Sequence, residues 1–253
     1  MATVLITGAA GRVAGQLRPG LEGLDLRVTD RRDVQGWDGA EVVVGDLSDP
    51  AFAARAVGGV DAVVHLAASP IPSAPWADLR SPNVDTVAIV LDAALAAGVA
   101  KVVLATSVHV MGGYVRPGGA VVDPSWPARP CCRYGATKAF AEAYGSVVAA
   151  SGGTSVVCLR LGLCRQTPTT TSDIAEWLAP ADLRRLVRAA LAAEVRYGAY
   201  FGVSANTRRL FDLSNARADL GYEPLLDSEV FADEVPPGPA GLCTVAHPAP
   251  PPA

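Results

Sequence analysis

Apolar positions in this chain gather in short continuous runs and do not alternate regularly with polar ones. Runs of this kind are typical of strands that are buried on both faces, as in parallel sheets. We expect six such strands, at 3–8, 26–30, 41–46, 60–68, 100–107 and 154–162. The stretches between them include segments of helical length, at 87–98 and 136–150. Strands that alternate with helices predict an α/β fold with a doubly wound parallel sheet and right-handed crossovers.

Two long loops and a proline-rich end interrupt this alternation. The loops cover 68–76 and 116–130, and each follows the C-terminal end of a strand, where sheets of this kind bind ligands. The last twenty residues hold seven of the 20 prolines. We expect one domain over 1–234, with a small substrate lobe from about 162 to 234, and a disordered tail without catalytic role at 235–253.

Composition and charge exclude several classes of protein. The chain has 253 residues, of which 50% are hydrophobic and 18% are charged, which allows one large domain with a sizeable core. A net charge of −4 without basic runs argues against a nucleic-acid partner. No stretch approaches about 18 uninterrupted apolar residues, and no charged segment precedes the first strand, so we expect neither a membrane span nor a signal peptide.

The cysteines are odd in number and scattered, at Cys131, Cys132, Cys158, Cys164 and Cys243. They form no CxxC pair and no Cys/His spacing typical of zinc, so we expect no metal site. We interpret them as reduced thiols in a cytoplasmic protein.

The segment RYGATKAF (133–140) holds the first candidates for catalysis. Tyr134 precedes Lys138 by four residues, and positions i and i+4 share one face of a helix. An ammonium beside a phenol favours the phenolate and lowers the tyrosine pKa, which a general base near neutral pH requires. The alternative is two side chains on a solvated helix face, and the spacing alone does not separate these interpretations.

A glycine loop follows the first strand. Residues 7–15, TGAAGRVAG, place Gly8, Gly11 and Ala14 in a G-x-x-G-x-x-A pattern between a strand and a helix. Glycines at these positions let the backbone turn tightly and approach a pyrophosphate, which then lies at the start of the helix. The alternative is a glycine-rich turn that binds nothing.

An acidic residue at the end of the next strand adds to this pattern. Asp30 would accept hydrogen bonds from the adenosine ribose and repel a 2′-phosphate, so the sequence favours NAD over NADP. Arg31 and Arg32 follow directly and could hold a 2′-phosphate, so NADP stays open as an alternative.

Several stretches, taken in order from about residue 2 to about residue 225, resemble the extended short-chain dehydrogenase/reductase (NAD-dependent epimerase/dehydratase) family. They are the glycine loop, GDLSD (45–49), HLAA (65–68), NVDTV (83–87), TSVHVMG (106–112), YGATK (134–138), LRLG (159–162) and LGYEP (220–224). Within the family the chain is most similar to uronate dehydrogenases, which are also short. The resemblance implies a Rossmann-like fold with a small C-terminal substrate lobe, and an NAD-dependent dehydrogenase that forms a homodimer.

The resemblance also implies roles for individual residues. The implied catalytic residues are Ser107, Tyr134 and Lys138. The implied cofactor contacts, besides Tyr134 and Lys138, are Gly8, Ala10, Gly11, Arg12, Val13, Asp30, Arg31, Asp46, Leu47, Leu66, Ala67, Ala68 and Asn83. The implied substrate contacts are Ser69, Ser107, Val108, His109, Tyr134 and Ser172.

Two departures from uronate dehydrogenases bear on the substrate. Val108 stands where those enzymes have an asparagine. The stretch TPTTTSDIAEW (167–177) lacks the arginine that grips the substrate carboxylate there, and Ser172 lies near its place. A carboxylate buried without a cation is costly. The substrate could therefore be a neutral sugar, a cyclitol or another polyol, or Arg165 could replace the missing arginine.

Two other functions stay open at this point. One is a redox-neutral nucleotide-sugar epimerase or dehydratase, although the short C-terminal part leaves little chain to hold a nucleotide sugar. The other is a non-catalytic NAD-sensing protein, against which the complete serine, tyrosine and lysine set argues. Net accumulation of NADH separates a dehydrogenase from both.

Overall fold

A seven-stranded parallel sheet forms the centre of the protein. The computed structural model describes residues 2–116, 118–238 and 242–243. The strands lie in the order β3-β2-β1-β4-β5-β6-β9, and every neighbouring pair is parallel. They are β1 (Thr3–Thr7), β2 (Asp25–Asp30), β3 (Glu41–Val44), β4 (Ala62–His65), β5 (Lys101–Ser107), β6 (Ser155–Leu161) and β9 (Tyr197–Gly202). The order reverses between β1 and β4, so the expected doubly wound, Rossmann-like fold is confirmed.

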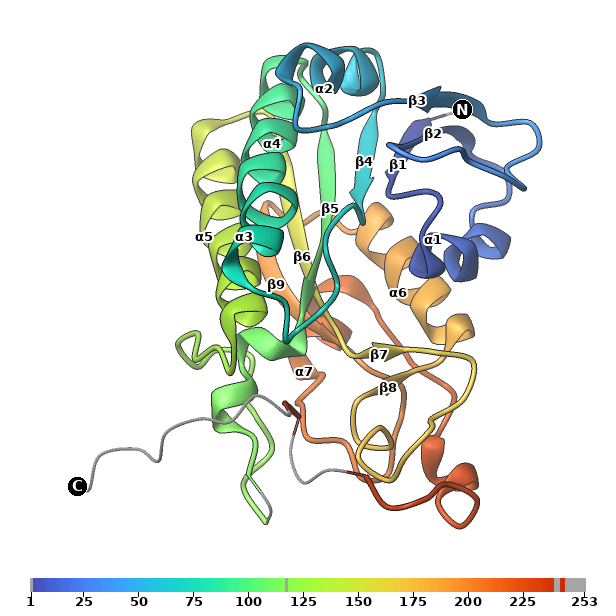
Figure 1. Cartoon of the computed structure of the whole chain (residues 1–253), viewed down its shortest axis with the longest axis vertical. Helices are drawn as coiled ribbons and strands as arrows, with labels where there is room; N and C mark the ends of the chain where they lie inside the picture. The colour runs from blue at the N-terminus through green and yellow to red at the C-terminus, as the bar shows by residue number, and fades with distance from the viewer. Residues whose placement is uncertain (1, 117, 239–241, 244–253) are drawn as a thin grey trace.

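Helices cover both faces of the sheet (Figure 1). One face carries α1 (Arg12–Leu17) and α6 (Pro180–Ala192), and the other carries α2 (Pro50–Val57), α4 (Thr86–Ala96) and α5 (Arg133–Ser151). Each face has its own apolar core: Val4 and Ile6 of β1 belong to one, and Leu5 belongs to the other. Successive strand residues point to opposite faces, and here both faces are buried, which explains the continuous apolar runs.

The strand of the central sheet that the sequence did not predict is β9. Its sequence, YGAYFG, has strand-favouring aromatic residues, but two glycines interrupt them and no β-branched residue is present, so the continuous apolar run of the other strands is missing. Its position beside β6 nevertheless buries Tyr200 and Phe201 completely. Packing in the sheet therefore defines this element more clearly than its sequence pattern does.

The C-terminal part adds a small lobe beyond the sheet. It contains the two-stranded sheet of β7 (Leu163–Cys164) and β8 (Trp177–Leu178), followed later by α7 (Ser214–Leu220). The long loop after β5 is bound to this lobe, because Val122 pairs with Phe211 in an isolated parallel bridge. The lobe therefore lies at the end of the sheet where β5 and β6 finish (Figure 1).

The proline-rich end is described only at 235–238 and 242–243. There, Pro236 accepts a hydrogen bond from the Thr171 N–H at 3.0 Å, and the Gly238 N–H donates to the Thr171 hydroxyl at 3.1 Å. The rest of the expected tail lies outside the described residues. Within the described ranges, no helix is long and apolar enough to cross a membrane.

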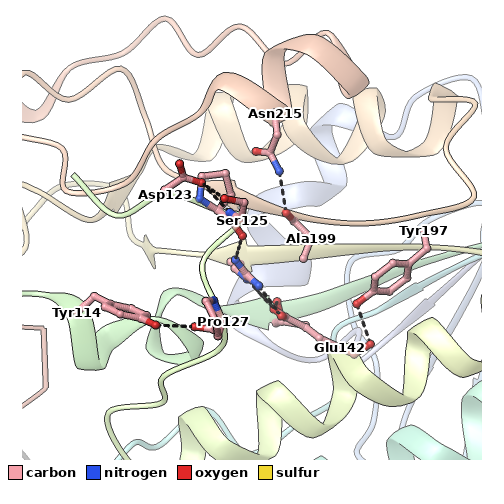
Figure 2. Close-up of polar contacts among 11 residues, drawn as sticks. Tyr114, Asp123, Ser125, Pro127, Glu142, Tyr197, Ala199 and Asn215 are labelled. Carbon is pink, nitrogen blue, oxygen red and sulfur yellow. Dashed lines mark hydrogen bonds and ion pairs between the residues drawn. The ribbon is translucent and has the colours of Figure 1, made fainter. Parts of the chain in front are cut away.

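A buried ion pair joins α5 to the sheet. The Arg160 guanidinium of β6 lies 2.8 Å from the Glu142 carboxylate of α5, and both side chains are 7% exposed. The Thr106 hydroxyl of β5 donates to the same carboxylate at 2.9 Å. Tyr197 of β9 donates its hydroxyl to the Glu142 carbonyl at 2.9 Å (Figure 2). Three strands are thus fastened to α5 one helical turn after Lys138.

A π-helical turn joins two helices on the same face. The turn, Ser81–Asp85, continues α3 (Trp76–Arg80) directly into α4. Its Asn83 is fully buried, and the side-chain amide accepts from the Ser69 N–H at 2.7 Å and donates to the Ser69 carbonyl at 3.0 Å. The same amide donates to the Thr137 hydroxyl at 3.2 Å. Asn83 therefore fixes the loop after β4 against α5.

Candidate active site

A cleft of about 550 Å³ opens at the C-terminal ends of the central strands. The glycine loop lines one side of the cleft. The end of β5 and the start of α5 line the adjacent side. Residues 161–165 and Glu176 of the C-terminal lobe close the opposite side. The cleft lies at the point where the strand order reverses, which is where doubly wound sheets bind dinucleotides.

The glycine loop has a backbone that other residues would obstruct. Gly8 has a φ of +69°, and a Cβ there would lie 2.8 Å from the Ala67 nitrogen. A Cβ on Gly11 would lie 2.9 Å from the Gly8 carbonyl oxygen. Trp37 supports the loop from below by donating its indole N–H to the Ala9 carbonyl at 3.1 Å. Such a cradle fits a pyrophosphate that approaches the backbone closely, so the residues present suit NAD.

Asp30 lies at the end of β2 and organises the acidic side of the cofactor site. Its carboxylate accepts from the Ala10 N–H at 3.2 Å and from the Arg32 N–H at 3.0 Å. The Arg32 guanidinium lies 3.3 Å from the same carboxylate. Arg32 is therefore paired with Asp30, and this pairing, with the carboxylate itself, favours NAD over a 2′-phosphorylated cofactor.

Ser107, Tyr134 and Lys138 meet in the cleft, as the resemblance implies. Ser107 ends β5, while the other two lie one helical turn apart near the start of α5. The Lys138 ammonium donates to the Ala105 carbonyl at 2.9 Å and lies 5.8 Å from the centre of the Tyr134 ring. The fold thus brings together residues that the sequence separates by about thirty positions.

Burial changes the pKa of both helix residues. It raises the pKa of Tyr134 to about 12, and the hydrogen bond from Ser107 acts in the opposite direction. It lowers the pKa of Lys138 to about 8. The sequence predicted a lowered pKa for the tyrosine, and in the fold this pKa is raised instead. The physical reason is desolvation, which favours the neutral form of each side chain.

Close packing positions α5 against the end of β5. A Cβ on Gly135 would lie 2.4 Å from the His109 carbonyl oxygen, so the helix reaches this turn only because residue 135 has no side chain. The His109 and Tyr134 rings meet edge to face with centres 5.6 Å apart. His109 and Val108 both line the cleft, as expected for substrate contacts.

The predicted cofactor and substrate residues divide into two groups. Those that line the cleft, besides the catalytic three, are Gly8, Gly11, Arg12, Val13, Leu66, Ala68, Val108 and His109. Those that lie outside its lining are Ala10, Asp30, Arg31, Asp46, Leu47, Ala67, Ser69, Asn83 and Ser172. Within the second group, Asp30 ends β2 and Asp46 comes shortly after β3. Both lie on the side of the sheet where the adenosine half of the cofactor is expected.

Ser172, like Ser69, is a predicted substrate residue that does not line the cleft. The described tail covers it: a Cβ on Gly238 would lie 2.4 Å from the Ser172 hydroxyl oxygen. Arg165 and Glu176, at the two ends of the same loop, line the cleft instead. The position of the loop, which no sequence pattern fixes, decides which of its side chains reach the cleft.

On the side of the cleft that the C-terminal lobe forms, Arg165 has an N–H group that is unpaired in the part of the chain that the structure describes, and Glu176 has a raised pKa. Arg165 donates to the Thr169 hydroxyl at 3.2 Å, and its buried Nε has no hydrogen-bond partner among the described residues. Burial, and secondarily Asp173, raises the pKa of Glu176 to about 8. Sequence reasoning raised Arg165 only as a substitute and missed Glu176, for which the sequence holds no signal.

Comparisons with known proteins agree with this geometry. NAD-dependent glucose-6-phosphate dehydrogenase of Haloferax volcanii is 34% identical over 91% of this chain and 96% of its own length. L-arabinose 1-dehydrogenase (NAD(P)(+)) of the same organism is 32% identical over 88% of this chain and 96% of its own length. The crystal structure of uronate dehydrogenase from Agrobacterium tumefaciens superimposes with a TM-score of 0.87 at 29% identity, covering 94% of this chain and 91% of that one.

The family assignment rests on the sequence of most of the sheet. Residues 4–165 match the family described as the NAD dependent epimerase/dehydratase family. This range runs from β1 through β6, and it includes the glycine loop, the serine and the tyrosine–lysine pair. The chain therefore belongs to the NAD dependent epimerase/dehydratase family.

Proposed function

We propose that this protein is an NAD-dependent dehydrogenase that oxidises a hydroxyl-bearing carbon of a sugar or sugar acid. The observation that carries the proposal is the convergence of Ser107, Tyr134 and Lys138 on the cleft that the glycine loop lines. The relatives named above are sugar and uronate dehydrogenases and are similar along nearly the whole chain. Their similarity supports a dehydrogenase rather than a redox-neutral epimerase.

Ser107, Tyr134 and Lys138 have separate roles in removing the proton of the substrate hydroxyl. Tyr134, as phenolate, takes the proton of the substrate hydroxyl, and Ser107 hydrogen-bonds the reacting oxygen. Lys138, held by the Ala105 carbonyl, supplies a positive charge that stabilises the phenolate. NAD, when bound, supplies the acceptor for the hydride that leaves the same carbon.

Arg165 supports an acidic substrate. Its Nε is buried at the cleft without a partner among the described residues, and an unpaired guanidinium N–H is costly. A carboxylate or phosphate of the substrate would satisfy it, because arginine binds such groups through paired N–H donors. We therefore place the anionic group of the substrate beside Arg165, which takes over from the arginine that TPTTTSDIAEW lacks.

The C-terminal part, 162–234, is proposed to supply the substrate lobe of a single domain through its segments other than α6 and β9, which belong to the central sheet and its cover. It supplies Gly162, Leu163, Cys164, Arg165 and Glu176 to the cleft, opposite the glycine loop. A cytoplasmic location is proposed as well, because a dehydrogenase of this kind draws on the cellular NAD pool and its thiols are those of a reducing compartment.

We further propose a homodimer that forms through α4 and α5. These helices lie side by side on one face, and Tyr144 of α5 donates to the Asp92 carboxylate of α4 at 2.8 Å. Phe140 and Tyr144 stack with ring centres 5.6 Å apart, and Val147 is 59% exposed. An exposed apolar and aromatic stripe of this kind suits a self-complementary interface.

The first experiment follows reduced cofactor by absorbance with NAD⁺ or NADP⁺ and a panel of uronates, sugar phosphates, neutral aldoses and cyclitols. We expect net NADH with an acidic sugar. Tyr134→Phe should bind NAD normally and lower kcat by about 10²- to 10⁴-fold, whereas Tyr144→Phe on the same helix should keep the activity. Turnover that survives Tyr134→Phe would show that another group is the base.

The substrate class is tested separately. Arg165→Gln should raise KM for the acidic substrate by about 10- to 100-fold with a smaller effect on kcat. Turnover with uncharged sugars or cyclitols alone would mean that Arg165 does not bind substrate. Cofactor binding without net reduction by any compound would instead favour a redox-neutral epimerase or a sensor.

A further inference from the structure

The fold gathers four sulfur and nitrogen ligands beside the active-site tyrosine. They belong to His109 in the turn after β5, to Cys131 and Cys132 just before α5, and to Cys243 at the end of the described chain. Their ligand atoms all lie within 4.8 Å of one another. The sequence predicted no metal site, because these residues come from three separate segments and match no zinc spacing.

The distances inside this Cys/His cluster are close to those of a tetrahedral metal site. His109 Nδ1 lies 3.1 Å from the Cys131 sulfur and 3.5 Å from the Cys132 sulfur, and the two sulfurs are 4.0 Å apart. Bond lengths of about 2.3 Å for Zn–S and about 2.0–2.1 Å for Zn–N place tetrahedral neighbours about 3.5–3.8 Å apart. Small side-chain shifts are therefore enough to close the cluster around one ion.

We propose that the Cys/His cluster binds one zinc ion with the ligand set Cys₃His. Thiolate and imidazole are the ligands that select zinc over magnesium or calcium. Four protein ligands fill a tetrahedral ion completely, which is the arrangement of a structural site and leaves no position for a substrate. The Gly135 N–H donates to the Cys132 sulfur at 3.4 Å, the kind of outer hydrogen bond that orients a metal-bound thiolate.

The ion would stabilise one wall of the active site. It would join Cys243 to the start of α5, two residues before Tyr134. It would also fix the ring of His109, which packs edge to face against the Tyr134 ring. Of the four proposed ligands, His109 also lines the cleft, and the test of the metal site does not depend on turnover.

The test uses the full chain without a polyhistidine tag, reduced and freed of metal by a chelator. Titration with Co²⁺ should give one ion per chain, with the thiolate-to-cobalt charge-transfer band and the intense visible bands of tetrahedral Co²⁺. Zn²⁺ should then displace the Co²⁺ and remove both signals. Mass spectrometry under native conditions should find one zinc ion per chain.

Three variants locate the site. Cys243→Ser and Cys132→Ser should each weaken the affinity for Zn²⁺ by at least about tenfold and lower the charge-transfer intensity. Cys158→Ala removes a buried thiol of β6 outside the cluster and should leave both unchanged. Cys243 lies beyond the last helix, so its variant tests the site without disturbing the sheet.

Two results would overturn the proposal. The first is a failure of metal binding at the cluster, seen either as wild-type protein without a tetrahedral Co²⁺ spectrum or as a Cys243→Ser variant that binds like wild type. The second is unreduced protein whose mass and peptide map show a disulfide within the cluster in place of zinc, which would make it a redox pair. Neither result depends on the NAD reduction assay, so the zinc site and the dehydrogenase function can fail independently.

Discussion

Burial sets the chemistry of the individual residues in the cleft. Tyr134 and Lys138 each lose solvent, and each is pushed towards its neutral form, with pKa values of about 12 and about 8. Proton removal needs a phenolate and a charged lysine. Desolvation disfavours both of these forms, so other contacts must stabilise them. The hydrogen bond from Ser107 is the contact that favours the phenolate.

A rise of activity with pH follows from these values. Well below the pKa of Tyr134, each pH unit increases the phenolate fraction about tenfold, so kcat/KM for oxidation should rise from about pH 6 upwards. The rise should flatten above about pH 8, where Lys138 loses its charge. A profile of kcat/KM against pH measures both features. A flat profile over this range would contradict the role of Tyr134 as the base.

Glu176 gives a pH-dependent contribution to stability. Its folded pKa of about 8 lies above the ordinary glutamate value of 4.5, so the folded state retains a proton that the unfolded chain releases. The stability that this proton provides is complete below about pH 4.5 and is lost as the pH rises through about 8. Glu176→Gln should therefore stabilise the protein relative to wild type more at pH 8 than at pH 5.

Urea unfolding at the two pH values measures this difference. Glu22→Gln, at an exposed glutamate, serves as the control and should show the same change in unfolding free energy at both. An equal effect of Glu176→Gln at both pH values would mean that Glu176 is ionised in the folded protein.

At the scale of elements, α5 does most to assemble the site. Tyr134, Lys138 and Glu142 follow one another at intervals of four, so one face of the helix presents them in a row. The first two line the cleft, and the third is fixed to Arg160 and Thr106 in the sheet. The sequence revealed the first interval, but only the fold shows that Glu142 anchors the same face.

Removing one partner of the buried ion pair should be costly. Glu142→Ala leaves the Arg160 guanidinium buried without its carboxylate, and we expect a loss of about 3–5 kcal/mol in unfolding free energy. The double variant Glu142→Leu with Arg160→Met should recover most of this loss, because an apolar pair carries no unpaired charge. Denaturant unfolding measures both, and a double variant as unstable as Glu142→Ala would contradict this account.

For the whole molecule, the order of the sheet decides where the site lies. The cleft opens at the C-terminal ends of β1 and β4, where the strand order reverses, and the C-terminal lobe supplies its far side. The helix that carries Tyr134 has its opposite stripe on the surface, with Val147 exposed. One helix thus serves both the cleft and the proposed dimer face.

The dimer can be tested at Val147. The wild-type protein should show twice the mass of one chain in light scattering, and Val147→Asp should shift it towards the monomer, because a charge in an apolar interface is costly. Val230→Asp, at a valine that is 72% exposed away from α4 and α5, should keep the dimer. A wild-type monomer, or equal behaviour of the two variants, would argue against this interface.

The sequence by itself determined the parallel sheet, the glycine loop with Asp30, and the interval between Tyr134 and Lys138, whereas Ser107 came from the family resemblance. The first three are each encoded locally: a continuous apolar run, glycines where backbone must approach a ligand, or an interval of four on a helix. Family resemblance added the order in which these signals occur.

Only the tertiary structure decided the rest, because it depends on contacts between distant segments. β9 pairs with β6 although its two glycines interrupt the apolar run that marks the other strands. Arg165 and Glu176 reach the cleft, and Ser172 does not, because of how one loop packs. The raised pKa of Tyr134 comes from desolvation, which depends on the surrounding fold and cannot be seen in a spacing of residues. The same reason hid the Cys/His cluster: its ligands are neighbours in space and far apart along the chain.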